Sequence, residues 1–387
     1  MRYRYENFGG IISSESPAFL AYVDRDYMLS LGFSNSSLWN TFDTSINLLS
    51  APTEVHFAIT NKCSVYCPHC YMGAGTEEIG ELSTELFKDC LNILSSMKVF
   101  HIALGGGDAL ERPDLFEIAD YARKIGIVPN LTISGINMTP NISEKMKCFG
   151  QINISMDGVY EYYSVFRGKN LFEVADYAIG CLVKAGISTG INCVVGKSNF
   201  SHIPKLFKYA AKKKLNEIEF LRLKPSGRCN DIYYKEKTTF EQNISLIPLL
   251  SRLSQKYGIT AKIDCSFVPM LCYHNPPLDI LDKMAAYGCE AGNVLLGIRS
   301  NGSVCGCSFL NPSNVSIFDF ASGYSAEKYF KDLLSWTSFA KEPCKSCTYL
   351  HLCKGGCHAV AHFVEGSIFY PDPECPKKTS LMHGKRT

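Results

Sequence analysis

The sequence lacks a long apolar run and any strong excess of charge of one sign. No stretch of 18 apolar residues occurs in its 387 positions, so no membrane span is expected. The formal net charge is +2, which gives no indication of nucleic-acid binding. Residues 1–10 hold no apolar signal core, and the number and spacing of the 18 cysteines argue against an oxidised, secreted scaffold. A reducing cytoplasm is therefore expected.

What the sequence does contain is a compact cysteine loop after a strand-like segment. Cys63, Cys67 and Cys70 follow residues 55–60 with the spacing C-x3-C-x2-C. A [4Fe–4S] cluster normally takes four thiolates, so a loop that offers three leaves one iron open to a small molecule. The same thiols together with His69 could instead hold zinc.

Helix-like and strand-like segments alternate after this loop, which predicts a parallel sheet. We count six β-α units between residues 51 and 258, too few for a complete eight-stranded barrel. In parallel barrels the chemistry lies at the carboxyl ends of the strands. The polar or glycine residues expected there are Gly105, Gly106, Gly107, Asp108, Ser134, Ser155, Asp157, Asn192 and Arg222.

The cysteine loop and the glycine run one β-α unit later resemble those of the radical S-adenosylmethionine (SAM) enzymes. The resemblance implies a partial (β/α)6 barrel whose open iron binds SAM and whose electron splits it into methionine and a 5′-deoxyadenosyl radical. Asp108 stands where the family usually has glutamate, so the charge is kept and the reach is shorter. The cofactor contacts implied by the resemblance are His69, Gly105, Gly106, Gly107, Asp108, Ser134, Ser155, Asp157, Arg167 and Asn192.

A second group of cysteines resembles the SPASM domain, an appendage that binds auxiliary iron–sulfur clusters in many radical SAM enzymes. By this resemblance, the first auxiliary cluster takes Cys289, Cys307 and Cys357, and its fourth ligand is Cys305, Cys265 or none. The second takes Cys344, Cys347, Cys353 and Cys375. Three [4Fe–4S] clusters are thus expected, and a pair of zinc sites is the alternative for this region.

These observations predict three domains: a short β-hairpin extension over residues 1–50, the barrel over 51–260 and the SPASM domain over 261–387. The extension faintly resembles the opening of a leader-peptide recognition domain, although a hairpin that caps the barrel explains it as well. No catalytic residue, bond formed or oligomeric state is predicted.

The expected activity is modification of a ribosomally made peptide or protein side chain, for example by thioether or carbon–carbon cross-linking. The expected partners are that precursor and a reductant such as ferredoxin or flavodoxin, in an anaerobic cytoplasm, without nucleic acid or membrane. Decarboxylation of a haem precursor by an enzyme of the same class is one alternative. A cysteine-rich zinc-binding module without enzymatic activity is the other.

Overall fold

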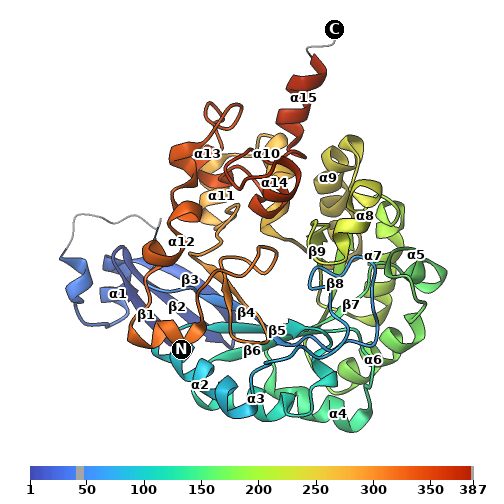
Figure 1. Cartoon of the computed structure of the whole chain (residues 1–387), viewed down its shortest axis with the longest axis horizontal. Coiled ribbons are helices and arrows are strands. Elements are labelled where there is room, and N and C mark those ends of the chain that lie inside the picture. Colours follow the sequence, from blue (N-terminus) through green and yellow to red (C-terminus); the bar gives the residue numbers. More distant parts are fainter. Residues whose placement is uncertain (41–47, 385–387) are drawn as a thin grey trace.

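A curved sheet of nine strands forms the centre of the protein, in a computed structural model that describes residues 1–40 and 48–384 (Figure 1). The strand order is β10-β9-β8-β7-β6-β5-β4-β11-β12, and every neighbouring pair is parallel except β11 and β12. The strands are β4 (Glu54–Thr60), β5 (His101–Gly106), β6 (Val128–Ile133), β7 (Ile152–Ser155), β8 (Thr189–Val195), β9 (Glu217–Arg222), β10 (Thr260–Ile263), β11 (Leu295–Ile298) and β12 (Val304–Cys305).

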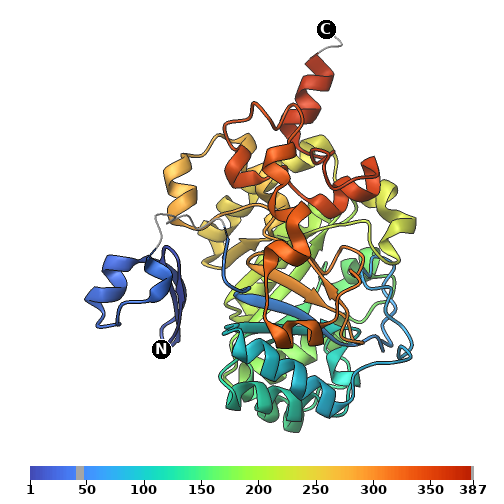
Figure 2. The same ribbon diagram turned by 60° about the vertical axis from the view of Figure 1, so that its left-hand side comes forward.

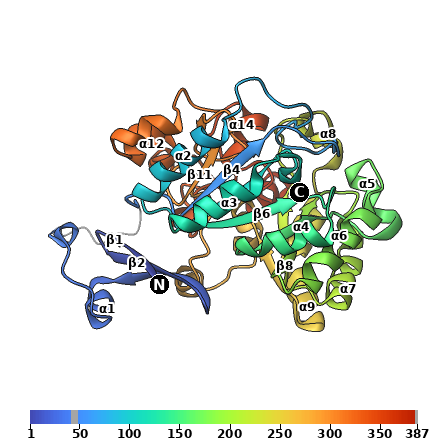
Figure 3. The same cartoon turned by 90° about the horizontal axis from the view of Figure 1, so that it is seen from below.

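Helices cover the convex side of this sheet, as the view from below shows (Figure 3). Alternate residues of each strand face these helices: on β4, Val55, Phe57 and Ile59 are buried, and Phe57 stacks on Phe87 of α2 with ring centroids 4.1 Å apart. The covering helices are α2 (Thr84–Ser96), α3 (Leu115–Lys124), α4 (Pro140–Lys145), α6 (Phe172–Lys184), α7 (Ile203–Lys213) and α9 (Phe240–Tyr257). The other face of the sheet lines a central bore.

The predicted mixed α/β fold with a parallel sheet is confirmed, and all six predicted strands are present between residues 54 and 222. Two parallel strands were not predicted. β10 follows the sixth unit at one edge of the sheet, and β11 pairs with β4 near the other edge, 241 positions away in the chain. Because β11 and β12 come from the cysteine-rich region, that region is joined to the barrel by main-chain hydrogen bonds. The three-domain division stays a prediction.

The N-terminal segment is a three-stranded antiparallel sheet, so the predicted simple hairpin was incomplete. It comprises β1 (Arg2–Glu6), β2 (Gly9–Glu15) and β3 (Ala18–Asp24), followed by α1 (Arg25–Ser30). A turn at Asn7 and Phe8 breaks the expected first strand in two. This sheet stands beside the barrel (Figure 2). Residues 41–47 and 385–387, which belong to the predicted first and third domains, lie outside the described residues.

Two arginines attach the N-terminal sheet to the segments that lead into β4 and β5. Arg4 is buried and donates to the carbonyls of Ala51 and Pro52, at 2.5 and 3.0 Å. Arg2 donates to the carbonyls of Val99 and Phe100, both at 3.0 Å. These contacts fit a cap over the amino ends of the barrel strands.

The remaining helices follow the barrel and gather on one side of the molecule, apart from two that lie in connections between barrel strands (Figure 1). The two are α5 (Tyr163–Arg167) and α8 (Cys229–Glu236). The others are α10 (Val268–Tyr273), α11 (Leu278–Lys283), α12 (Ala326–Leu334), α13 (Leu350–Cys353), α14 (His358–Glu365) and α15 (Pro376–Gly384). Across the described part of the chain, no helix is long and apolar enough to cross a membrane.

Candidate active site

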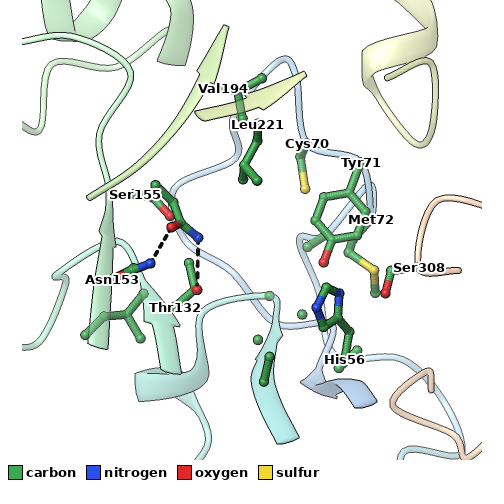
Figure 4. Close-up of a pocket in the computed structure, with 18 of the residues that line it drawn as sticks. His56, Cys70, Tyr71, Met72, Thr132, Asn153, Ser155, Val194, Leu221 and Ser308 are labelled. Atoms are coloured by element: carbon green, nitrogen blue, oxygen red, sulfur yellow. Dashed lines mark hydrogen bonds between the residues drawn. The ribbon is translucent and has the colours of Figure 1, made fainter. Parts of the chain in front are cut away.

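A cavity of about 470 Å³ occupies the bore of the sheet, and the three-cysteine loop forms part of its wall. Side chains from both sides of the bore point into it (Figure 4). The sequence-predicted site residues that line the cavity are Cys63, Cys67, His69, Cys70, Gly105, Gly106, Gly107, Asp108, Ser134, Ser155, Asp157, Arg167, Asn192 and Cys305. The structure therefore brings all the predicted SAM contacts to one place.

The cysteine loop is held by a second loop that sequence analysis did not identify. Arg228 donates from Nε to the carbonyl of Cys67 at 3.0 Å and from Nη1 to that of Ala74 at 2.7 Å. Its main-chain amide donates to the carbonyl of Cys70 at 3.0 Å, and its guanidinium lies 3.9 Å from the ring centroid of Tyr66. The adjacent Ser226 hydroxyl donates to the carbonyl of Tyr71. The loop geometry thus depends on a segment from the end of β9.

Asp157, Arg167 and His69 form a buried cluster beside Cys67. Asp157 accepts from Arg167 at 2.8 Å, contacts His69 Nε2 at 3.1 Å and accepts from the amide of Val194 at 2.7 Å. Burial opposes ionisation of Asp157, but Arg167 and His69 hold its pKa below the usual value. Arg167 also donates to the sulfur of Cys67 at 3.3 Å, while its Nε has no protein partner. Arg167 therefore connects the cysteine loop to the strand ends.

The glycine run passes very close to the cysteine loop. Gly107 donates to the carbonyl of Thr60 at 2.7 Å, and a Cβ added to Gly107 would lie 1.9 Å from the carbonyl oxygen of Lys62. Gly106 has φ +108°, a region that other residues rarely adopt. A Cβ added to Gly105 would meet nothing within 4 Å, so this residue keeps cavity space open.

Asp108 and Ser134 join the ends of β5 and β6. The buried Asp108 carboxylate accepts from the amide of Ser134 at 2.9 Å, from the Ser134 hydroxyl, and from the amide of Leu110 at 3.1 Å. Burial raises the pKa of Asp108, and these hydrogen bonds oppose that shift. In this arrangement the Asp108 side chain braces two strand ends, so its predicted contact with SAM stays a prediction.

Asn192 is hydrogen-bonded within a row of polar side chains across the bore, of which Figure 4 labels Thr132, Asn153 and Ser155. Asn153 donates to Asn192 at 2.6 Å, and Asn192 donates to Thr132 at 3.2 Å. Ser155 lies two residues beyond Asn153 on β7 and therefore faces the same side of the sheet. Above this row, Val194 and Leu221 give the cavity an apolar wall.

Four thiols from the cysteine-rich region lie near enough to affect one another's pKa. They are Cys265, Cys289, Cys307 and Cys357. Burial, followed by the charges of Asp264, Cys289 and Cys307, raises the pKa of Cys265. Burial and then Cys289 and Cys357 raise the pKa of Cys307 to about 12. The Cys265 side chain is exposed. By contrast, burial raises the pKa of Cys305, and its polar neighbour is Arg299.

A second group of thiols surrounds Cys344. Burial, then Cys375 and Cys347, raise the pKa of Cys344 to about 12. A hydrogen bond with Cys272, burial, and the charges of Cys375 and Cys344 raise the pKa of the Cys353 thiol. Within the described chain, no three His, Cys, Asp or Glu side chains are arranged to hold a single metal ion.

The cavity fits a radical SAM cofactor set on two counts. Three thiols from one short loop can supply a cluster and leave one iron open, and Gly105 leaves the adjacent wall without side chains. Comparison with known proteins agrees with this fit. Residues 57–210 match the family model described as the radical SAM superfamily.

Three relatives align over most of the chain. "Mycofactocin maturase MftC" of Mycobacterium tuberculosis is 29% identical over 84% of this chain and 83% of its own length. "AdoMet-dependent heme synthase" of Methanosarcina barkeri is 28% identical over 85% of this chain and 98% of its own. "PqqA peptide cyclase" of Bradyrhizobium diazoefficiens is 23% identical over 84% and 86%, respectively.

The fold is also that of a solved structure. Streptococcus suis SuiB bound to S-adenosylmethionine superposes with a TM-score of 0.73 at 18% identity, covering 96% of this chain and 98% of SuiB. One conclusion follows from four observations, which are the three-cysteine loop, the parallel sheet, the family match and the relatives. This chain carries a radical SAM domain, which implies SAM and a [4Fe–4S] cluster, and it is a radical SAM enzyme.

Proposed function

We propose that this enzyme modifies a side chain of a ribosomally made peptide or protein in a reducing cytoplasm, with a ferredoxin- or flavodoxin-like protein as reductant. The observation that carries the proposal is the three-thiol loop at the wall of a cavity that continues deep into the bore. Relatives that include a maturase and a peptide cyclase over most of the chain support it. Cross-links such as thioether or carbon–carbon bonds are the expected products.

When bound, the cluster and SAM would supply a carbon-centred radical that removes a hydrogen atom from the substrate. The chain's own residues position these groups. Cys63, Cys67 and Cys70 would hold the cluster, Arg228 fixes their loop, and Gly105 leaves room for SAM. Val194 and Leu221 keep water from the apolar part of the cavity.

We infer two auxiliary clusters as well. The second would take Cys344, Cys347, Cys353 and Cys375. The first would take Cys289, Cys307 and Cys357, with Cys265 as its fourth ligand, because the charges of Cys289 and Cys307 reach Cys265 whereas Cys305 adjoins Arg299. This assignment closes the first auxiliary cluster, so the substrate would not bind one of its irons.

Haem-precursor decarboxylation is the second candidate, since a heme synthase is among the relatives. A tetrapyrrole carries several propionates and needs cations that are free to bind them. The cationic side chains that line the described cavity have partners within the protein. These are Arg167 with Asp157, Arg222 with Asp372, Lys224 with Asp264, Lys262 with Glu217, and Arg228 and Arg299 with main-chain carbonyls. This pairing favours a peptide substrate.

Anaerobic reconstitution tests the cofactor assignment. The wild-type protein should bind about 12 iron atoms and, once reduced, convert SAM to 5′-deoxyadenosine. Changing Cys63, Cys67 and Cys70 together to Ala should abolish that product and leave about eight irons. SAM cleavage by the triple variant would refute this active site. Conversion of an iron–porphyrin precursor, with no product from peptides encoded beside the gene, would favour the second candidate.

The fourth ligand is tested in the same preparations. Cys265→Ala should alter the electron paramagnetic resonance signal of the first auxiliary cluster, whereas Cys305→Ala should leave it unchanged. The reverse result would assign Cys305 instead.

A further inference from the structure

The bore of this sheet is hollow and carries polar side chains among apolar ones, whereas the interior of a complete parallel barrel is packed with branched apolar side chains. Besides the apolar Val194 and Leu221, the inward-facing strand positions hold small or polar residues, which are Glu54, His56, Ala58, Ala103, Gly105, Asn130, Thr132, Gln151, Asn153, Ser155, Asn192, Glu217 and Glu219. Burying such groups without a ligand or water is unfavourable. The polarity therefore points to a molecule that enters the bore.

The inner end of the bore, away from the cysteine loop, carries five ionisable residues that line the cavity, which are Glu54, His56, Glu217, Glu219 and Lys262. Glu54 and His56 lie two positions apart on β4, with Nε2 of His56 3.5 Å from the Glu54 carboxylate. Both side chains line the cavity and are 41% and 40% accessible. Glu219 comes from β9, on the opposite side, and its only side-chain donor in the described residues is Asn153, at 3.5 Å.

The charge at this inner end is negative. Lys262 is paired with Glu217 at 2.5 Å, and Lys224 is paired with Asp264. Among the described basic residues that line this end of the cavity, only His56, 3.5 Å from Glu54, is not already paired with a carboxylate other than Glu54 or Glu219. Burial, followed by the like charges of Asp264 and Glu54, raises the pKa of Glu219 to about 7. A ligand cation beside Glu219 would relieve this repulsion.

We propose that the inner end of the bore binds a positively charged side chain of the substrate, a lysine or an arginine, between Glu219 on β9 and Glu54 on β4. A long, flexible side chain with a terminal cation suits a deep bore with carboxylates at its end. The adjacent residues of the substrate would then lie nearer the cysteine loop, where the reaction takes place. This inference rests on the proposed peptide-modifying function and names the residue that the enzyme selects.

Binding of capped pentapeptides to the reconstituted enzyme with SAM tests the proposal. The probes are acetyl-Gly-Gly-X-Gly-Gly-amide with lysine, arginine, norleucine or glutamate at X, measured by calorimetry under anaerobic conditions. The lysine or arginine peptide should bind at least about tenfold more tightly than the norleucine peptide, and the glutamate peptide most weakly. Equal binding of the lysine, arginine and norleucine peptides would overturn the proposal.

Two variants test the residues. Glu219→Gln and Glu54→Gln should each reduce the preference for cationic peptides to about twofold or less. Glu173→Gln, on the exposed face of α6, is the matched control and should keep the wild-type preference. Iron content and circular dichroism establish that the variants are folded. An unchanged preference in both folded variants would also overturn the proposal.

The peptide-binding test can fail independently of the proposed function. If the wild type fails to produce 5′-deoxyadenosine from SAM, the proposed function fails, whatever the peptides do. If SAM is cleaved and the peptides bind without regard to charge, only the inference about the bore fails.

Discussion

Single glycines set the distance between the end of β5 and the cysteine loop. Gly107→Ala would bring a Cβ to 1.9 Å from the Lys62 carbonyl, where main chain rather than a flexible side chain must move. We expect a loss of about 1–3 kcal/mol in the free energy of unfolding. Gly105→Ala adds a methyl group to open cavity space, so stability should change little while SAM binding weakens.

Thermal unfolding and calorimetric titration with SAM distinguish the two variants. If Gly105→Ala binds SAM as the wild type does, the cofactor does not occupy the space beside Gly105. The sequence predicted this glycine run because of its place after a strand, but not which glycine faces the cavity. That depends on the register between β4 and β5.

Arg228 is a residue that the sequence did not single out. Its partners Cys67, Cys70 and Ala74 lie more than 150 positions earlier, so nothing local in the sequence indicates the contact. Arg228→Lys keeps the charge and loses the forked geometry that reaches two carbonyls. Loss of these hydrogen bonds should cost about 1–3 kcal/mol and reduce the occupancy of the first cluster.

Iron analysis and electron paramagnetic resonance of the SAM-binding cluster measure this effect. Arg252→Lys, on the exposed side of α9, is the control. Full iron content and an unchanged signal in Arg228→Lys would show that the cysteine loop keeps its geometry without the hydrogen bonds from the Arg228 guanidinium.

At the scale of elements, hydrophobic periodicity was sufficient to predict six strands and the helices between them. It did not predict β10 and β11. Each of the two is only four residues long, and β10 has an accessible, alternating pattern that resembles a loop. β11 is defined by pairing with β4, which is distant in the chain. The first strand of the N-terminal sheet was merged with the second because the turn at Asn7 lacks a proline or an Asn-Gly pair.

A buried ion pair connects β9 to the segment between α14 and α15. Arg222 donates to both carboxylate oxygens of Asp372, at 2.5 and 2.9 Å, and Asp372 accepts from the amide of Cys357 at 2.9 Å. Asp372→Asn leaves Arg222 charged and only partly paired, because Glu374 remains 3.2 Å away. We expect a loss of about 3–5 kcal/mol in the free energy of unfolding.

Denaturant titration of the reconstituted protein checks this expectation. Asp279→Asn removes an exposed pair with Lys283 at 3.4 Å, and this control should change stability by less than about 1 kcal/mol. Equal stability of the two variants would show that the cysteine-rich region does not depend on Arg222 for its attachment.

At the scale of the molecule, the cysteine-rich region is continuous with the barrel. β11 extends the barrel sheet, Arg222 reaches Asp372, and Tyr233 of α8 bonds Glu374. The cysteine spacing predicts two groups of cluster ligands in this region, which stay predictions. It left Cys265 as one of three options for the first group, because 24 and 42 positions separate it from Cys289 and Cys307, and only the fold shows that the charges of these two thiols reach it. Only the folded chain brings these sulfurs together.

This continuity makes a prediction about the second auxiliary cluster. Changing Cys344 and Cys347 to Ser should remove about four of the expected twelve irons and lower the melting temperature, because cluster binding contributes folding energy. Turnover of substrate should be lost, whereas substrate-free cleavage of SAM should persist in part, because the cluster that binds SAM is held by the barrel.

Changing the half-buried Cys148 and Cys181 to Ser gives a control with the same number of thiols removed. A Cys344/Cys347 variant that folds with full iron content would refute this ligand set. One that loses four irons and still modifies substrate normally would show that the cluster serves stability alone.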